Sequence, residues 1–182
     1  MAAGDGLVSM TPTSISYSGT SATINTNGGV DFTAVTSLSL NGVFTSNHDN
    51  YLVVIQLQGD VTGAYLQARL RAAGTDNSTA SSYVRQRLDA NNITIQSDRT
   101  TSDLTHILRE LSAITSGCDL YVYGPALAQP TAMRSVTVGG RNGGWISDLA
   151  TSHNQSVSYD GFTIYPTSGN VTGNVHVFGY EE

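Results

Sequence analysis

Hydrophobic and polar residues alternate along most of this chain in short runs, and residues that favour turns separate one run from the next. The stretch 64–72 is the clearest case, because Leu66, Ala68 and Leu70 alternate there with polar and cationic residues. An alternation of period two is typical of a β-strand that buries one face and exposes the other. The most apolar run, 51–58, predicts a central strand that is covered on both faces at its start and half exposed at its end.

Two glycine-containing signals predict tight hairpins. Asn27-Gly28-Gly29 lies between the runs 22–26 and 30–33, and these residues tolerate the positive φ angles of a short hairpin turn. Asp160-Gly161 lies in the same way between 156–159 and 162–165. Each signal predicts a pair of adjacent antiparallel strands.

Segment 103–111 is ambiguous. Its apolar residues have helical spacing, and Ser102 is a suitable residue for capping a helix. The runs on either side of the segment have β character, and this context favours a strand. The apolar residues are Leu104, Ile107, Leu108 and Leu111.

The pattern as a whole predicts an all-β protein. About ten to twelve short strands with turn signals between them indicate an antiparallel β-sandwich or jelly roll. No internal repeat or linker divides the 182 residues, a length that fits one domain. Residues 1–11 are mostly small, so we expect an extended N-terminal arm there and a single β-sandwich domain over 12–182.

Composition narrows the classes of function. Charged residues make up 12% of the chain and the net charge is −6, so we expect no basic patch for nucleic acid. No apolar run approaches the roughly 20 residues of a membrane helix, so we expect no membrane insertion. Residues 1–8 lack the basic start and the apolar stretch of a secretory signal, which predicts synthesis in a cytoplasm.

Residues that could carry chemistry do not form catalytic or metal-binding patterns. The histidines lack the spacing of metal ligands, and no Gly-x-Ser-x-Gly motif indicates a serine nucleophile. Cys118 is the single cysteine, and Glu110 is the only glutamate before the C-terminal pair. We therefore expect no catalytic residue, no metal site and no cofactor, and hence no enzyme. The histidines are His48, His106, His153 and His176.

Aromatic residues offer one binding chemistry. Trp145 follows a glycine-rich stretch that contains Arg141, and such a pair can stack on the apolar face of a sugar ring. Tyr121 and Tyr123 are further candidate platforms for a glycan. The competing interpretation, which we favour for Trp145, is a core side chain that plugs the edge of a sheet.

An ordered set of short motifs resembles a family of small virion proteins of tailed bacteriophages. The set spans nearly the whole chain. It consists of Gly-Leu-Val at 6–8, Thr-Pro-Thr-Ser at 11–14, the segment 37–44, Asp-Asn-Tyr at 49–51, the segment 70–76, Tyr-Gly-Pro at 123–125, Ala-Gln-Pro-Thr at 128–131, the segment 158–162 and the segment 175–180.

The resemblance implies a β-sandwich module that occurs as a free-standing minor tail protein and at the end of longer tail fibres. The main functional expectation is therefore a virion structural protein of the tail, exposed on the particle and in contact with the host surface. A capsid decoration protein on the head is the alternative, and a carbohydrate-binding adhesin module is a further one. The expected partners are other virion proteins, a host-surface glycan and further copies of the chain, with a trimer favoured. The family has no catalytic residues to carry over.

Overall fold

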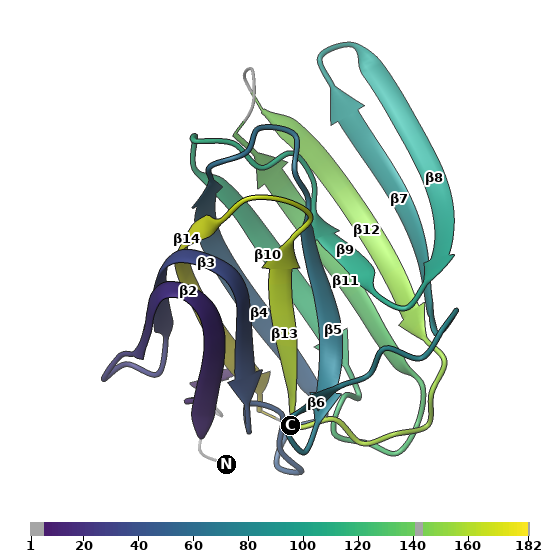
Figure 1. Cartoon of the computed structure of the whole chain (residues 1–182). Coiled ribbons are helices and arrows are strands. Elements are labelled where there is room, and N and C mark those ends of the chain that lie inside the picture. The colour runs from purple at the N-terminus through teal and green to yellow at the C-terminus, as the bar shows by residue number, and fades with distance from the viewer. Residues whose placement is uncertain (1–5, 141–143, 182) are drawn as a thin grey trace.

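A computed structural model describes residues 6–140 and 144–181, and strands make up its regular structure (Figure 1). All pairings between neighbouring strands are antiparallel. The strands are β1 (Leu7–Ser9), β2 (Ser14–Ile24), β3 (Val30–Asn41), β4 (Asn50–Gly59), β5 (Leu66–Ala72), β6 (Thr75–Asp76), β7 (Tyr83–Asn91), β8 (Thr94–Ser102), β9 (Thr105–Leu108), β10 (Ser116–Tyr123), β11 (Thr131–Gly139), β12 (Trp145–His153), β13 (Gly161–Pro166) and β14 (Val171–Tyr180).

The strands form one sheet that curls into two layers. Its order is β6-β5-β13-β3-β14-β4-β10-β11-β12-β7-β8, and β3 connects the layers because it pairs with both β13 and β14. Figure 1 shows β2, β3, β13 and β5 in front of the layer that contains β4, β10, β11 and β12. The predicted all-β antiparallel sandwich is therefore confirmed.

The core fills the space between the layers. On β4, Tyr51, Val53, Ile55 and Leu57 are buried, and they face apolar residues of β3, β5 and β13. Between them Leu52 and Val54 are half-buried, whereas Gln56 and Gln58 are exposed. This pattern confirms the prediction for 51–58, since β4 lies between β10 and β14 and becomes more exposed towards its end.

The ambiguous segment 103–111 contains a strand. β9 pairs with β5, where Thr105 lies opposite Ala68 and Leu108 opposite Leu66. The helix alternative is wrong because the backbone of this segment pairs with a neighbouring strand. Within the described residues, no helix is long and apolar enough to cross a membrane.

One predicted hairpin is confirmed and the other is wrong. The turn at 27–29 joins β2 to β3, with the amide of Asn25 2.7 Å from the carbonyl oxygen of Gly29. Residues 154–159 are not a strand, and Gly161 begins β13. A Cβ atom on Gly161 would lie 2.0 Å from the carbonyl oxygen of Leu40, so glycine is required there for close strand packing and not for a turn.

β12 has no clear alternation of hydrophobic and polar residues in the sequence. Its inward side chains are all buried, yet several of them are polar. Small hydroxyl residues on the inner face hid the alternation from which a strand is predicted. The inward residues are Trp145, Ser147, Leu149, Thr151 and His153.

Part of the expected N-terminal arm belongs to the sheet. Leu7, Val8 and Ser9 form β1, which pairs with the end of β14. The amide of Met10 continues this pairing with a hydrogen bond to the carbonyl oxygen of Val177, at 2.9 Å. Residues 1–5 of the arm lie outside the described part of the chain.

Candidate binding surfaces

Tyr121 and Tyr123 lie side by side on the outer face of β10. Tyr121 is opposite Arg134 on β11 and Leu52 on β4, and Tyr123 is opposite Asn50 on β4. The ring of Tyr123 is 43% exposed, and Tyr121 is half-buried. The structure thus brings together two of the three candidate glycan-binding residues.

Two aromatic residues of β14 extend this surface. Phe178 pairs with Leu52, which in turn pairs with Tyr121, so the three residues form one row across the sheet. Burial raises the pKa of Tyr180, and the nearby Tyr121 and Tyr123 raise it further. The sequence analysis missed this contribution because nothing in the sequence shows that β14 and β10 flank the same strand. We call Tyr121, Tyr123, Phe178 and Tyr180 the aromatic patch.

An ion pair lies beside the aromatic patch. Arg134 donates two hydrogen bonds to Asp148 on β12, at 3.0 Å from Nε to Oδ1 and 2.6 Å from Nη2 to Oδ2. These bonds lower the pKa of Asp148 and raise the pKa of Arg134. Both side chains are exposed, at 56% and 41%, so they also present hydrogen-bonding atoms to solvent. The surface therefore combines aromatic rings with fixed polar groups.

Trp145 does not belong to this surface. Its ring is 7% exposed on the inner face of β12, and the guanidinium carbon of Arg109 lies 4.7 Å from the ring centre. The same guanidinium lies 5.6 Å from the ring of Tyr65 on the segment that leads into β5. Arg141, the neighbour that we considered with Trp145, lies outside the described residues. The structure gives Trp145 a packing role at the start of β12.

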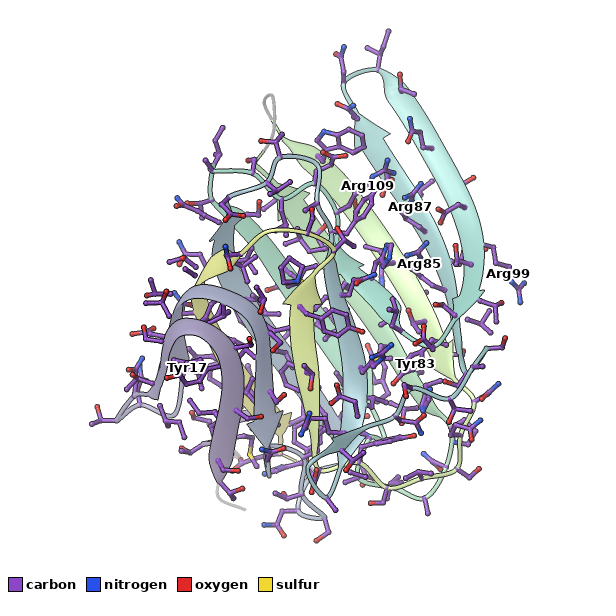
Figure 2. All side chains as sticks on the ribbon, in the orientation of Figure 1. Tyr17, Tyr83, Arg85, Arg87, Arg99 and Arg109 are labelled. Carbon is purple, nitrogen blue, oxygen red and sulfur yellow. The ribbon has the colours of Figure 1, made fainter. Side chains whose placement is uncertain are left out.

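A cluster of ion pairs lies between the β7–β8 hairpin and the segment after β9. Figure 2 shows Arg85, Arg87 and Arg109 converging there. Asp89 is buried and forms ion pairs with Arg87, at 2.9 Å, and with Arg109. Asp98 lies 3.3 Å from both Arg85 and Arg87. Burial lowers the pKa of Arg85, and Asp98 opposes this shift. Each of these two carboxylates is held by two arginines. The cluster therefore joins β7 to β8 and to the segment after β9.

The histidines and the cysteine lie in packed environments. His153 stacks on Tyr83 with 4.1 Å between ring centres, and its Nε2 lies 2.5 Å from the hydroxyl of Tyr159. Burial lowers the pKa of His153 and of His106 to about 4. Burial likewise raises the pKa of the Cys118 thiol. In residues 6–140 and 144–181, no group of three or more His, Cys, Asp or Glu could hold a metal ion.

Several motifs that carry the bacteriophage resemblance meet at one end of the sandwich. The amide of Gly124 donates to the carbonyl oxygen of Asp49 at 2.8 Å, and the amide of Tyr159 donates to that of Pro125 at 2.7 Å. The carbonyl oxygen of Asp160 accepts from the amide of Phe44 at 3.1 Å. These motifs therefore hold loops together at this end of the sandwich.

Comparison with known proteins does not assign a family. No protein-family model matches the sequence, and no curated protein matches it. Among solved structures, the C-terminal CBM6 of LamC, a marine laminarinase from Zobellia galactanivorans, is 14% identical, with 95% of this chain and 98% of that chain covered and a TM-score of 0.35. The Caenorhabditis elegans galectin LEC-6 is 10% identical, with 85% and 99% covered and a TM-score of 0.37. At such TM-scores the backbones diverge, so neither structure defines a ligand site in this chain.

Proposed function

We propose that this chain is a non-catalytic binding module that binds carbohydrate on its outer face. The observation that carries the proposal is the aromatic patch with the Arg134–Asp148 pair beside it. Sugar rings present apolar C–H faces that stack on aromatic side chains, and hydroxyl groups that bond to charged and amide groups. Tyr123 supplies the most exposed ring of the patch, and Asn50 on the neighbouring strand supplies an amide.

The chemistry of the interior supports a role without turnover. Among the described residues, the buried Cys118 thiol has a raised pKa and is therefore held protonated. Asp89 and Asp98 are paired with arginines, so neither is set up as a general acid or base. A carbohydrate that binds to this face would be held and released unchanged.

The test is binding of immobilised glycans, using a panel of bacterial surface polysaccharides and short glucans. Wild-type protein should bind at least one member, and Tyr123→Ala should weaken that binding by about tenfold or more. Tyr17→Ala is the matched control, because Tyr17 is 45% exposed on β2, which pairs with β3 and not with the strands that carry the aromatic patch. Both variants should melt like the wild type. Failure to bind any glycan, or equal binding by the Tyr123 variant, would overturn the proposal.

The setting that we propose for this module is the surface of a bacteriophage particle, on the tail or, as the alternative, on the head. It is supported by the ordered motifs and by the contacts that the motifs at 49–51, 123–125 and 158–162 make with each other. A virion surface protein has to withstand proteolysis, and extensive antiparallel pairing with short loops favours this. Electron microscopy of particles labelled with an antibody to this chain tests the setting. Particles without label at tail and head would contradict it.

A further inference from the structure

Large apolar side chains remain exposed on the outer face of the layer that ends in β8. Ile95 is 74% exposed, Ile146 64% and Val138 54%. In the strand register these three residues occupy one row, with Ala90 between Ile146 and Ile95. A contiguous exposed apolar surface on a soluble domain indicates an interaction site. We call the following residues the apolar strip: Leu88, Ile95, Val136, Val138 and Ile146.

The apolar strip has a hollow at one end and a projecting side chain at the other. Gly117 on β10 lies opposite Val138, and the surface there opens into a hollow of about 470 Å³. Val54, Val136, Val138 and Ile146 are among its lining residues. At the other end, Ile95 projects from the edge strand β8. The row therefore has a hollow at Gly117 that could accept an apolar side chain, and an exposed apolar side chain, Ile95, at its other end.

The spacing of these features fits two-fold symmetry. Gly117 and Ile95 are each two strands away from Ile146, because the strand order is β10-β11-β12-β7-β8. We propose that the apolar strip joins this chain to a second copy of itself, face to face, about an axis that runs along β12. Each copy then places its Ile95 over the other copy's Gly117, and Val138 meets Ala90. An isologous interface requires such self-complementarity.

Charge on the same face also fits a second copy. Within the described part of the chain, Arg99 makes no ion pair, unlike the other arginines there. Figure 2 shows its side chain pointing away from the sandwich. Asp119, exposed beside the hollow, has the opposite sign. The two-fold arrangement brings Asp119 opposite the second copy's Ser97, two residues from Arg99, so these opposite charges approach each other. The same row places Asp148 opposite its own copy on the axis, and each of these carboxylates is already paired with Arg134.

The available area predicts a weak dimer. Five strands at about 4.8 Å spacing and about 20 Å of strand length cover about 500 Å² on each copy, which is below the usual size of a specific interface and typical of weak complexes. The area includes Asp148, which lies between Val136 and Leu88, so the interface borders the proposed carbohydrate surface at the Arg134–Asp148 pair. The rings of the aromatic patch lie further along, across β10, β4 and β14.

Sedimentation of the full chain between about 1 and 200 µM tests the inference. The wild type should pass from monomer to dimer in this range, and Ile146→Asp should weaken association by about tenfold or more because it buries a charge. Ser152→Asp is the matched control, since Ser152 is exposed on the same face of β12 beyond the apolar strip. Gly117→Val, which fills the hollow, should also weaken association, and its Cβ makes only an ordinary contact with Val138, at 3.5 Å.

Melting temperatures show whether each variant is folded. A wild type that stays monomeric at the highest concentration overturns the inference. So does a dimer or larger oligomer that Ile146→Asp and Gly117→Val leave unchanged. A trimer, the state expected from the family resemblance, would contradict the two-fold arrangement.

Discussion

The guanidinium carbon of Arg109 lies 4.7 Å from the centre of the indole ring of Trp145, and this contact holds the single tryptophan in a packed position, 7% exposed. Arg109 also bonds the buried Asp89 of β7, so the indole, the guanidinium and the carboxylate form one packed unit. The contact joins the start of β12 to the segment after β9. It favours the interpretation of Trp145 as a side chain that plugs the edge of the sheet.

Replacing Trp145 with alanine should destabilise the fold. The substitution removes a ring that is 7% exposed and leaves Arg109 without its stacking partner, so we expect a loss of about 3 kcal/mol in the free energy of unfolding. Urea denaturation measures this loss. Ser152→Ala, at an exposed position of the same strand, should change stability by less than about 0.5 kcal/mol. A Trp145→Ala protein of wild-type stability would show that the ring is not a packing element.

The two kinds of ion pair in this chain should differ in their contribution to stability. Asp89→Asn removes a buried charge that holds Arg87 and Arg109, so we expect a loss of about 3 kcal/mol. Asp148→Asn breaks the exposed pair with Arg134 and should cost less than about 1 kcal/mol. Equal losses on chemical denaturation would mean that the buried cluster is not structural.

Gly161 should not tolerate a side chain. A Cβ atom there would meet the carbonyl oxygen of Leu40 at 2.0 Å, so Gly161→Ala has to push β13 away from β3. We expect a loss of more than about 2 kcal/mol. Gly117→Ala serves as the control, because its Cβ would make only an ordinary contact at 3.5 Å. Thermal unfolding of the two variants tests this expectation. Equal melting temperatures for Gly161→Ala and Gly117→Ala would contradict it.

The free energy of unfolding should decrease as the pH is lowered below neutrality. Burial lowers the pKa of His106 and His153 to about 4 in the folded chain, whereas an exposed histidine has a pKa of about 6.5. Between these values the unfolded chain binds more protons, so the stabilisation is complete above about pH 6.5 and is lost as pH falls towards 4.

Urea denaturation at several pH values measures this dependence, and His153→Gln should reduce its slope. The histidine ring of position 153 is fully buried against Tyr83, so its contribution is the easier one to isolate. A variant whose stability falls with pH as steeply as that of the wild type would show that His153 does not cause the effect.

The strands with the clearest signal in the sequence are those whose inward residues are apolar. β4 and β5 follow from alternation alone, because Tyr51 to Leu57 and Leu66 to Leu70 bury every second side chain. β12 could not be predicted because Ser147 and Thr151 occupy its inward positions. These positions are buried by the neighbouring layer, and the sequence does not show which layer covers them.

Only two of the four residues of the aromatic patch could be predicted, because the sequence does not show which strands become neighbours. Tyr121 and Tyr123 share a face because they are two residues apart on one strand. Phe178 and Tyr180 join them only because β14 pairs with the same strand as β10, and strand order depends on long-range packing. The apolar strip arises in the same way, since its residues come from two hairpins, β7–β8 and β11–β12, that lie far apart in the sequence and pair through β7 and β12.

A nuclear magnetic resonance titration of the labelled chain with a glycan that it binds tests the central claim most directly. We predict that shift changes concentrate at Tyr121, Tyr123, Arg134 and Tyr180, on the outer face of β10, β11 and β14. Changes concentrated around Trp145 and Arg109, or spread evenly over the molecule, would contradict a carbohydrate-binding role for this face.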